Sequence, residues 1–431
     1  MTPEVKERID QIRHGIVPEG YIKSKDGIYP GDWTSKKMGQ WLQLMERPIS
    51  LEDNEKYELV TVRRGFGGVD SRGTYLGKNV LVKNYFCLCT GDFVISKRQI
   101  AHGACGVVPA ELDGAVVSNE YNVFIPQEGT NINMFNLMMQ LPHYRRLFYL
   151  MSDGVHIEKL LFKTGDWMRR SLAMPSLEEQ EKIASILTMQ DKIIELEQQK
   201  IEEIKKAKRF FLEKMFPKEG QAVPEIRFKG FTAPWEQRKL GEMGQTYTGL
   251  SGKTKDDFGH GQARFVTYMN VFSNPISNPE MTEPIEIDSK QNEVEVGDVF
   301  FTTSSETPEE VGMSSILLEK RGKTYLNSFC FGFRPSEKID SYYLAYMLRS
   351  ESARAKITLL AQGISRYNIS KNKVMEIAIS LPSLDEQKMI GQYFSHLDHL
   401  ITLHQRKLEE EKRKKKTLMQ LLLTGLVRVN A

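Results

Sequence analysis

The sequence contains fragments of nucleotide-binding and methyl-transfer motifs, but each lacks a feature that its chemistry requires. Gly252-Lys253-Thr254 matches the end of a phosphate-binding loop, whose first glycine would fall at Tyr247, so the backbone cradle for phosphate is broken. Gly65-Phe66-Gly67-Gly68 follows two arginines and opens no recognisable helix, which argues against a cofactor loop. An amino-methyltransferase acting on DNA needs a Pro-Pro-aromatic turn, and the sequence has no Pro-Pro pair. We therefore predict no catalytic residue in this chain.

Hydrolytic and metal-binding motifs are missing as well. The chain has no His-Glu-x-x-His and no Gly-x-Ser-x-Gly sequence. Its four cysteines give no zinc spacing, because only Cys87 and Cys89 are close together and Cys105 and Cys330 stand alone. Carboxylate pairs such as Glu309-Glu310 lie in polar stretches typical of solvated loops. We expect buried, reduced thiols and no bound metal or cofactor.

The sequence contains an internal repeat of two copies, and this repeat predicts the architecture. With a shift of 207, the stretch from Pro175 to Lys208 aligns without a gap on the stretch that begins at Pro382, with 15 identities in 34 positions. Trp33 and Gly39 match Trp235 and Gly241 at a shift of 202, and Gly91-Asp92 matches Gly297-Asp298 at 206. Each copy is a variable region of about 140 residues followed by a helix of about 40.

Both repeated stretches predict long helices that pack on each other. Ser176 and Ser383 are expected N-caps, and the glutamates three residues later complete a capping box. Apolar residues then follow at steps of four and three, as in a coiled coil, over roughly 60 Å of helix. The polar seam positions also match between the copies: Glu197 aligns with His404 and Lys208 with Lys415. The residues expected at the helix–helix and partner interface are Ile183, Leu187, Ile194, Ile201, Ile204, Ile390, Phe394, Ile401, Leu408 and Leu418.

The regions between the helices have the pattern of mixed α/β domains. Strands are expected at 57–62, 93–96, 116–125, 265–268, 299–303 and 329–333, and helices at 135–151 and 341–360. Thr2 and Pro3 begin an N-terminal helix in which Ile9, Ile12 and Ile16 line one face. The predicted fold class is α+β: two mixed domains in tandem, joined and separated by two long helices packed as an antiparallel coiled coil.

The predicted boundaries follow the repeat. They are an N-terminal helical segment at 1–24, a first mixed domain at 25–173, a first spacer helix at 174–217, a second mixed domain at 218–380 and a second spacer helix at 381–425.

Composition is that of an ordinary globular protein and leaves nucleic acid open as a partner. The formal charge is +3, and 27% of residues are charged. This charge neither requires nor excludes DNA, because one basic face can coexist with an acidic remainder. No apolar run approaches the roughly 18 residues needed to cross a bilayer, and the charged N-terminus lacks a signal peptide. We expect a cytoplasmic protein.

The repeated motifs resemble the specificity (S) subunit of type I restriction-modification enzymes. The most specific part is Leu381-Pro382-Ser383-Leu384-Asp385-Glu386-Gln387 with the helix behind it, together with the earlier copy from Met174. The stretch from Phe228 to Gly241 resembles the usual entry into a second recognition domain. Gly297 to Glu306 is similar to one subgroup of such domains.

The resemblance implies a DNA reader without catalysis of its own. Each recognition domain would read one half of a bipartite double-stranded DNA target, and the helices would set the spacer between the halves. Two methyltransferase (modification) subunits would dock on the helical regions and transfer a methyl group from S-adenosylmethionine to adenine. Restriction subunits, which translocate and cut DNA, would join that complex. The S subunit itself would bind no cofactor.

Residue chemistry selects candidates for DNA contact. Base edges are read by Arg, Lys, Asn, Gln and hydroxyl side chains, and phosphates are held by basic and hydroxyl side chains. The candidates beside expected strand ends or in glycine-led loops are Arg63, Arg64, Lys97, Arg98, Gln99, Lys253, Lys255, Thr302, Thr303, Ser304, Ser305, Ser365, Arg366, Tyr367 and Asn368. The two helices and the N-terminal segment are the expected partner-contacting face.

Other interpretations stay open on the sequence alone. A stand-alone methyltransferase or nuclease is disfavoured by the missing motifs. A coiled-coil scaffold without a DNA role would explain the helices but would leave the duplicated mixed domains without a task. A specificity subunit of another restriction-modification type would have the same design. The target sequence, the spacer length and the individual base contacts do not follow from these patterns.

Overall fold

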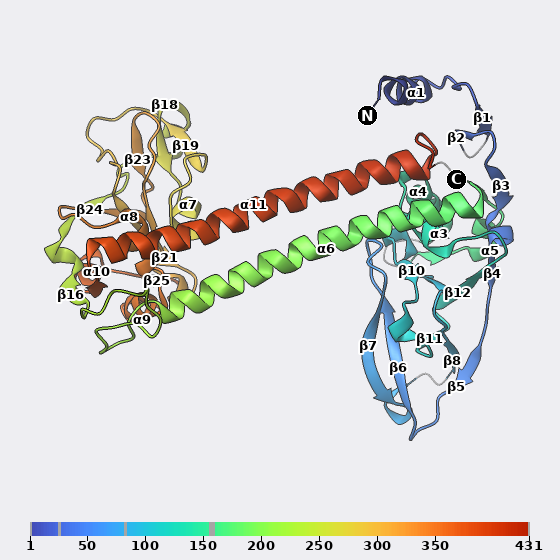
Figure 1. The fold of residues 1–431 in the computed structure, drawn as a ribbon, viewed down its shortest axis with the longest axis horizontal. Coiled ribbons are helices and arrows are strands. Elements are labelled where there is room, and N and C mark those ends of the chain that lie inside the picture. The colour runs from blue at the N-terminus through green and yellow to red at the C-terminus, as the bar shows by residue number, and fades with distance from the viewer. Residues whose placement is uncertain (1, 25–26, 82–83, 155–159, 430–431) are drawn as a thin grey trace. The chain divides into compact units, whose positions relative to one another are not determined.

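A computed structural model describes residues 2–24, 27–81, 84–154 and 160–429. The chain forms two compact units, which we call unit 1 (Met1–Leu196 with Leu408–Ala431) and unit 2 (Glu197–Lys407). The long helices α6 (Leu177–Lys214) and α11 (Leu384–Leu423) each begin in one unit and end in the other. Each unit therefore contains the start of one long helix and the end of the other (Figure 1).

The elements are many and mostly short. The other helices are α1 (Pro3–Arg13), α2 (Met38–Trp41), α3 (Ile132–Met139), α4 (Pro142–Leu150), α5 (Thr164–Met168), α7 (Tyr268–Ser273), α8 (Ser341–Met347), α9 (Glu351–Thr358) and α10 (Lys371–Met375). The strands of unit 1 are β1 (Tyr21–Ser24), β2 (Gly27–Pro30), β3 (Thr34–Lys37), β4 (Leu42–Leu44), β5 (Pro48–Ser50), β6 (Lys56–Val62), β7 (Val69–Leu76), β8 (Asn84–Cys87), β9 (Phe93–Ser96), β10 (Cys105–Val107), β11 (Val116–Ser118), β12 (Tyr121–Pro126), β13 (Ser152–Asp153), β14 (Leu161–Phe162) and β15 (Ser171–Met174). Those of unit 2 are β16 (Glu236–Lys239), β17 (Gly244–Thr248), β18 (Phe258–Val266), β19 (Thr282–Ile285), β20 (Val299–Thr302), β21 (Ser304–Ser305), β22 (Ser314–Ile316), β23 (Thr324–Leu326), β24 (Cys330–Pro335), β25 (Tyr367–Asn368) and β26 (Ala378–Leu381).

Each unit is built on small, largely antiparallel sheets with helices beside them. Unit 1 has a four-stranded sheet in the order β10-β9-β12-β4 and a five-stranded sheet in the order β5-β8-β11-β6-β7. Unit 2 has a four-stranded sheet, β17-β24-β20-β22, and a three-stranded sheet, β19-β18-β23. The mixed α/β character predicted for both regions is confirmed.

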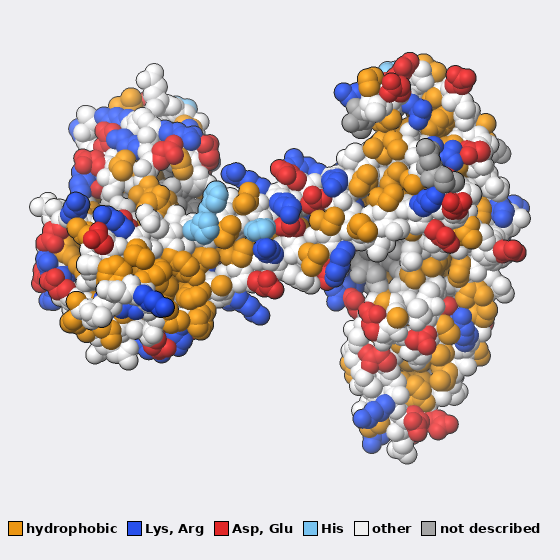
Figure 2. Space-filling view, in the orientation of Figure 1, with side chains coloured by type: hydrophobic (Ala, Val, Ile, Leu, Met, Phe, Trp, Pro, Cys, Tyr) orange, Lys and Arg blue, Asp and Glu red, His pale blue; other side chains and the backbone are white. Residues whose placement is uncertain are grey.

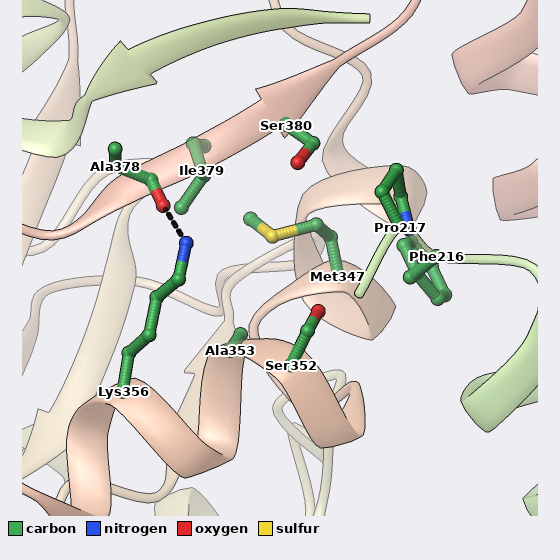
Figure 3. A pocket seen from close by; sticks show the side chains of 9 residues that line it. All are labelled: Phe216, Pro217, Met347, Ser352, Ala353, Lys356, Ala378, Ile379 and Ser380. Atoms are coloured by element: carbon green, nitrogen blue, oxygen red, sulfur yellow. Dashed lines mark hydrogen bonds between the residues drawn. The ribbon is translucent and has the colours of Figure 1, made fainter. Parts of the chain in front are cut away.

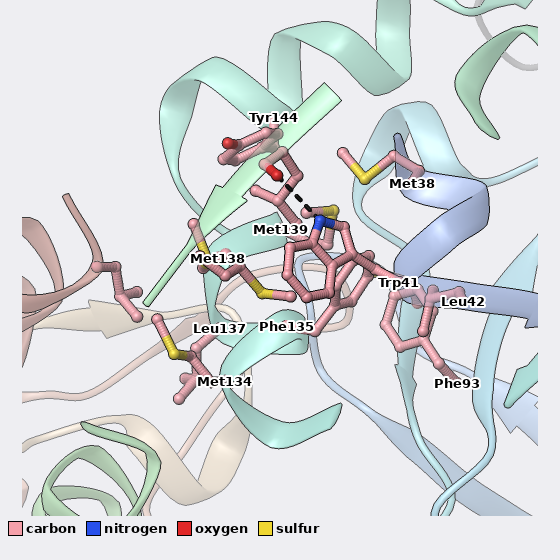
Figure 4. Close-up of a cluster of buried hydrophobic side chains, with 14 of the residues drawn as sticks. Met38, Trp41, Leu42, Phe93, Met134, Phe135, Leu137, Met138, Met139 and Tyr144 are labelled. Carbon is pink, nitrogen blue, oxygen red and sulfur yellow. Dashed lines mark hydrogen bonds between the residues drawn. The ribbon is translucent and has the colours of Figure 1, made fainter. Parts of the chain in front are cut away.

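Aromatic, methionine and leucine side chains pack together in the main core of unit 1 (Figure 4). Phe135 of α3 meets the ring of Phe93 edge-on at 5.4 Å, and Trp167 stacks on Phe148 at 5.9 Å. The indole of Trp41 donates to the carbonyl oxygen of Leu172 at 2.9 Å, so its polar atom is satisfied inside the core. Burying side chains of this size contributes about 1.5–3 kcal/mol each, enough to hold short strands together.

The sequence repeat is also a structural repeat. In unit 1, β15 pairs with β3 and places Met174 opposite Thr34. In unit 2, β26 pairs with β16 and places Leu381 opposite Glu236. These positions correspond under the shifts found in the sequence, so the strand before each long helix is anchored in the same register.

Several element predictions need correction. The helix expected over 135–151 is two helices, because Pro142 begins α4 and cannot continue α3. The helix expected over 341–360 is likewise α8 and α9, since the hydroxyl of Ser350 accepts from the amide of Ala353 and caps a new helix. The strand at 116–125 is split into β11 and β12, and the strand at 265–268 ends at Val266 because α7 starts at Tyr268. The spacer helices lie within the predicted ranges, and the N-terminal helix begins at Pro3 as predicted. The helical segment predicted at 1–24 is too long, because α1 ends at Arg13 and Tyr21–Ser24 forms β1.

The capping-box glutamates have a different role from the one predicted. Ser176 and Ser383 cap α6 and α11 through their hydroxyl groups. The carboxylate of Glu386, however, accepts two bonds from Arg227, at 2.7 and 2.8 Å. The carboxylate of Glu179 accepts in the same way from Arg428, at 2.8 and 2.7 Å. In each unit, an arginine that follows the end of one long helix therefore neutralises a buried carboxylate at the start of the other.

The glutamine of the repeated motif ties each helix start to its sheet domain. The side chain of Gln180 donates to the carbonyl oxygen of Pro175 and accepts from the amide of Asn131, which caps α3. Gln387 repeats both bonds, with Pro382 and with Asp340, the N-cap of α8. The repeated motif is thus a structural clamp.

Within each unit the two long helices run antiparallel. In unit 1, Gln190 of α6 donates to the carboxylate of Glu411 of α11, and Asp191 pairs with Lys415. In unit 2, the carboxylate of Glu197 contacts His404 at 2.8 Å and Lys407 at 2.5 Å. The ten predicted interface residues are buried (Ile183, Leu187, Ile201, Ile390, Phe394 and Leu408) or half-buried (Ile194, Ile204, Ile401 and Leu418).

The cysteines and the N-terminal segment differ in part from what the sequence predicts. All four cysteines are free, but Cys89 is exposed, which corrects the expectation that all were buried. In α1, Ile9 and Ile12 are half-buried, but Ile16 lies beyond the end of the helix at Arg13 and is exposed. The expectation that all three isoleucines line one helix face is therefore wrong for Ile16. None of the described helices has the length and apolar character that a membrane-spanning segment requires. No cluster of His, Cys, Asp or Glu suited to a metal ion occurs within the described ranges.

Candidate nucleic-acid interface

Two of the candidate stretches of unit 1 come together at one edge of the fold. The amide of Gly65 donates to the carbonyl oxygen of His102, and the amide of Phe66 donates to that of Gly103, both at 2.8 Å. Phe66 adopts a left-handed backbone with φ of 62°, and a Cβ atom at Gly103 would lie 2.7 Å from its ring. The loop that carries Arg63 and Arg64 is therefore fixed against the loop that follows Lys97, Arg98 and Gln99.

The charges at this edge are paired with neighbours at the surface. Arg63 forms an ion pair with Asp70, and Arg98 with Glu120 at 2.6 Å. The ammonium of Lys97 donates to the carbonyl oxygen of Asn119. Such exposed pairs are worth about 0–1 kcal/mol, so exchange for a phosphate group costs little. Arg64 is exposed and Gln99 is half-buried.

Sequence reasoning missed a further cation at the same edge. The guanidinium of Arg145 in α4 lies 5.4 Å from the centre of the Phe66 ring. Its position on an expected helix, away from any loop, gave no signal in the sequence.

The candidate stretches of unit 2 also meet. Strand β21 pairs with β25, which places Ser304 opposite Asn368 and Ser305 opposite Tyr367. Residues 362–368 form a hairpin closed by reciprocal backbone bonds between Gln362 and Asn368, at 2.9 and 2.8 Å. The hairpin requires Gly363, because a Cβ atom there would lie 2.0 Å from the carbonyl oxygen of Arg366.

Burial divides these candidates into two groups. Thr302, Ser304 and Ser305 have exposed fractions of only 0%, 5% and 6%, so their hydroxyl groups cannot reach a ligand. Thr302 ends β20, an inner strand of the four-stranded sheet, and Ser304 and Ser305 form β21, whose side chains are buried although it pairs only with β25. The sequence showed only that hydroxyl residues follow a strand. Thr303 and Tyr367 are half-buried, and Ser365, Arg366 and Asn368 are exposed. None of the ion pairs found among the described residues includes Arg366.

A groove beside this hairpin adds residues that sequence reasoning missed. It has a volume of about 380 Å³, and its polar lining consists of Thr248, Ser251, Thr303, Ser328 and Lys371. Ser328 immediately precedes a predicted strand and Lys371 follows Asn368 by three positions, so both adjoin stretches already selected. Hydroxyl groups with one ammonium are suited to the polar edges and phosphates of nucleic acid.

Lys253 and Lys255, the two lysine candidates of unit 2, differ in how accessible their ammonium groups are to DNA. The Lys253 side chain is 12% exposed and is held by Asp288 at 2.9 Å and by Asp257 at 3.6 Å. Its ammonium group holds the pKa of Asp288 well below the usual range. The Lys253 side chain is therefore held in ion pairs within unit 2, whereas Lys255 is exposed.

The candidate loops of the two units are structural equivalents. The amide of Phe162 donates to the carbonyl oxygen of Lys97 in unit 1, and the amide of Ile369 donates to that of Thr303 in unit 2, both at 2.9 Å. Lys97 and Thr303 correspond at the repeat shift of 206. The same place in both units thus carries solvent-facing polar side chains, which differ in kind between the units.

The repeated Gly-Asp landmark is structural. Asp92 accepts a bidentate pair of bonds from Arg47, at 2.6 and 3.1 Å, and Asp298 accepts one from Arg334, at 2.8 Å each. The hydroxyl of Tyr247 also donates to Asp298 at 2.5 Å, and burial is the largest cause that raises the pKa of this tyrosine. A packed tyrosine occupies the position where a phosphate-binding loop would need glycine, so the structure agrees with the absence of such a loop.

Neither the surface charge seen in Figure 2 nor the pocket beside Phe216 indicates a further site. On the face shown in Figure 2, basic and acidic side chains are interspersed over both units. A pocket of unit 2 between α9, β26 and Phe216-Pro217 measures about 10 Å³, room for one water molecule at most (Figure 3). Lys356 at its edge donates to the carbonyl oxygen of Ala378 and is thereby engaged.

Comparison with known proteins agrees with the duplicated design. The family model described as the type I restriction modification DNA specificity domain matches residues 30–206 and again 233–412. The MjaX type I restriction enzyme specificity subunit of Methanocaldococcus jannaschii is 24% identical over 433 residues, covering 95% of this chain and 97% of the relative. The MjaVIII specificity subunit of the same organism is 27% identical over 297 residues, covering 64% of this chain and 65% of the relative.

Solved structures show the same fold. A chain from a type I R-M system has a TM-score of 0.57 at 17% identity and covers 93% of this chain and 99% of its own length. The type I restriction-modification S subunit from M. genitalium has a TM-score of 0.53 at 14% identity, covering 90% and 96%. With the family model matched twice over most of its length, this chain belongs to the type I restriction-modification DNA specificity family.

Proposed function

We propose that the two units read the two halves of a bipartite double-stranded DNA target, one half each. The observation that carries the proposal is the pair of equivalent polar edges, built around Lys97 in unit 1 and Thr303 in unit 2. The backbone frameworks are alike, but the side chains at the two edges differ. Arginine and lysine side chains prevail in unit 1, whereas unit 2 has hydroxyl and amide side chains and one exposed arginine. Equal frameworks with unlike side chains suit readers of two different short sequences.

Two half-sites give this design its discrimination. A mismatched base pair typically costs about 1–3 kcal/mol, and the costs add for separate positions. Two readers in one chain therefore reject related sequences that either reader alone would accept. The interspersed surface charge in Figure 2 fits a protein whose specificity comes from a few side chains rather than from a broad basic face.

The chain itself performs no reaction in this proposal. Methyl transfer belongs to methyltransferase subunits that bind S-adenosylmethionine, and restriction subunits join that complex to translocate and cut DNA. The assembly acts in the cytoplasm, where chromosomal and invading DNA meet. The support is the absence of a complete catalytic motif in the sequence together with membership of the specificity family.

A second apolar stripe on α6 supports docking of a methyltransferase subunit on unit 1. Ile186, Met189, Ile193 and Leu196 follow each other at steps of three, four and three, and they lie beside the buried seam, not in it. Met189 is 66% exposed and Leu196 is 52% exposed. This spacing is that of a coiled-coil face without its partner helix in this chain.

The matching stripe of α11 supports a second docking site on unit 2. At the repeat shift of 207 the corresponding residues are Tyr393, His396, Leu400 and Leu403, and Leu403 is 50% exposed. The α11 copy keeps only part of the stripe, because His396 is polar and Tyr393 packs against Phe211 and Phe228. Both helices keep an exposed leucine at the same repeat position, Leu196 and Leu403, and we therefore propose two methyltransferase subunits per chain.

Mapping of methylated adenines tests the proposed function. Cells that express this chain with its partner methyltransferase gene should methylate one bipartite sequence, and cells that lack only this chain should not. The purified chain alone should transfer no methyl groups. Methylation independent of this chain would contradict the proposal and favour the coiled-coil scaffold. Cleavage without a translocating subunit would indicate another restriction-modification type.

A further inference from the structure

Two arginines of unit 2 are partly buried beside the proposed DNA-reading edge. Arg349 lies between α8 and α9, and Arg354 lies within α9. Burial lowers the pKa of each guanidinium to about 10. None of the ion pairs found in the described part of the chain includes either residue.

Both guanidinium groups bind backbone carbonyl oxygens. Arg354 donates to Glu309 at 2.8 Å, to Val311 at 2.6 Å and to Gly312 at 2.7 Å. Arg349 donates to Ser314 at 2.7 Å, to Val271 at 2.8 Å and to Phe272 at 3.0 Å. A guanidinium carries five N–H donors in a rigid plane, so it can hold several carbonyls at fixed relative positions.

The three acceptors of Arg354 belong to one loop. Residues 303–313 connect β20 to β22, start at Thr303 of the proposed reading edge and include the short strand β21. Gly312 in this loop has φ of +64°, and a Cβ atom there would lie 2.7 Å from Ile357 of α9. Helix α9 therefore supports the loop through one arginine and one close backbone contact.

This support does not depend on the side chains at the loop's tip. Glu306, Thr307, Glu309 and Glu310 are all exposed, although Arg354 grips the carbonyl group of Glu309. Hydrogen bonds to main-chain carbonyl groups fix the backbone conformation of the loop, whatever side chains the loop carries. Such an arrangement suits a loop whose residues determine sequence preference.

We propose that Arg354, supported by Arg349, is a positioning residue for the reading of the second half-site. It holds loop 303–313 by its backbone, so that Thr303 and the neighbouring hairpin 362–368 keep a fixed geometry toward DNA. This inference rests on the proposed function of unit 2. Arg354 itself does not touch the bases.

The test uses the full chain assembled with its methyltransferase subunits. Arg354→Met removes the grip, and Arg354→Lys keeps the charge but cannot span three carbonyls. Arg264→Met is the matched control, because Arg264 also bonds a backbone carbonyl, that of Thr282, but lies on β18. Methylation rates on a library with every base varied report the preference at each half-site separately, and amide hydrogen exchange reports the loop.

The expected result is a loss confined to the second half-site. Both Arg354 variants should lower discrimination there by about ten-fold, leave the first half-site unchanged and speed amide exchange in 303–313, whereas the control should do none of these. The proposal would be overturned if amide exchange became faster without a change in base preference. It would also be overturned if the folded Arg354→Lys variant lost discrimination equally at both half-sites. If the methionine variant does not fold, the lysine variant alone decides. Absence of any second-half preference in the unaltered chain would instead remove the proposed function.

Discussion

At the scale of single residues, the repeated Pro-Ser-Leu-x-Glu-Gln motif is explained by partners from elsewhere in the chain. Glu386 is almost fully buried, and a buried carboxylate is stable only when it is paired and hydrogen-bonded. Arg227 supplies both requirements, and Arg428 does so for Glu179. The contact that each glutamate side chain makes is thus an ion pair that ties the segment after one long helix to the start of the other.

Removal of Arg227 should therefore be costly. Arg227→Met leaves the Glu386 carboxylate buried without a cation, and we expect a loss of about 3–5 kcal/mol in the unfolding free energy of the unit that contains it. Urea denaturation followed by tryptophan fluorescence would measure this loss. Arg321→Met, which breaks pairs at the surface with Glu280 and Glu319, is the control and should have little effect. Equal effects of the two substitutions would contradict the argument.

The helix seam of unit 2 should weaken in acid. Lys407 and His404 hold the pKa of Glu197 below its ordinary value of 4.5. Because the pKa of Glu197 is lower in the folded chain, the ion pairs contribute fully above the ordinary value, and their contribution is lost as the pH falls from that value through the lowered pKa of the folded chain. The melting temperature of the native chain should fall more between about pH 6 and pH 3 than that of Glu197→Gln. Parallel curves for the two proteins would show that Glu197 is not linked to the transition.

At the scale of elements, α6 presents two apolar faces. One is buried in the core of unit 1, which also includes the end of α11, as Ile183 and Leu187 show, and the other is exposed, as Met189 and Leu196 show. A helix that packs only against its own domain needs one such face. The exposed face is the one that we propose as a docking site.

Charge on the exposed face should interfere with assembly. Met189→Asp places a carboxylate in the proposed docking stripe, and we expect at least ten-fold weaker capture of the methyltransferase subunit by the chain. Thr188→Asp, one position away and equally exposed, points along a different face and is the control. Pull-down with titrated methyltransferase measures both. Indistinguishable binding of the two variants would remove the stripe from the interface.

Charge in the buried seam should act on the same assembly by another route. Ile201 is 5% exposed, so Ile201→Asp buries an unpaired carboxylate and separates the helices. We expect methyltransferase assembly to suffer more than the base preferences of whatever complex still forms. Size-exclusion chromatography and methylation mapping report the two effects. Unchanged assembly would count against a role of the paired helices in organising the complex.

At the scale of the whole molecule, two units with equivalent frameworks carry separate sets of exposed residues. Each contains its own sheets and core, together with the start of one long helix and the end of the other. A substitution at the edge of one unit should therefore act on one half of the target and leave the other half as it was.

Substitution of Arg366 tests whether the two half-sites are read independently. It is exposed on the hairpin 362–368, and Arg366→Ala removes one cation without touching the core. If it holds a phosphate, binding of the assembled complex to DNA should weaken for all sequences, and the salt slope should fall by about 1. If Arg366 reads a base, the preference for that base at one position of the second half-site should weaken. The base preferences of the first half-site should then stay unchanged. Fluorescence anisotropy at several salt concentrations separates these results, and no change in either would exclude DNA contact.

The sequence by itself determined the repeat, the two long helices and their paired faces. These depend on spacing along the chain, since a helix repeats its faces every three or four residues wherever it lies. The short helices were less predictable, because a capping serine and a proline broke patterns that looked continuous.

Only the tertiary structure decided which candidate residues can meet a ligand. Thr302, Ser304 and Ser305 have the right chemistry but are buried, whereas Ser328 and Lys371 reach the groove from other parts of unit 2. The partner of Glu386 likewise stands 159 positions away in the chain. Burial and ion pairing depend on which distant segments pack together, and a local pattern of residues carries no information about that packing.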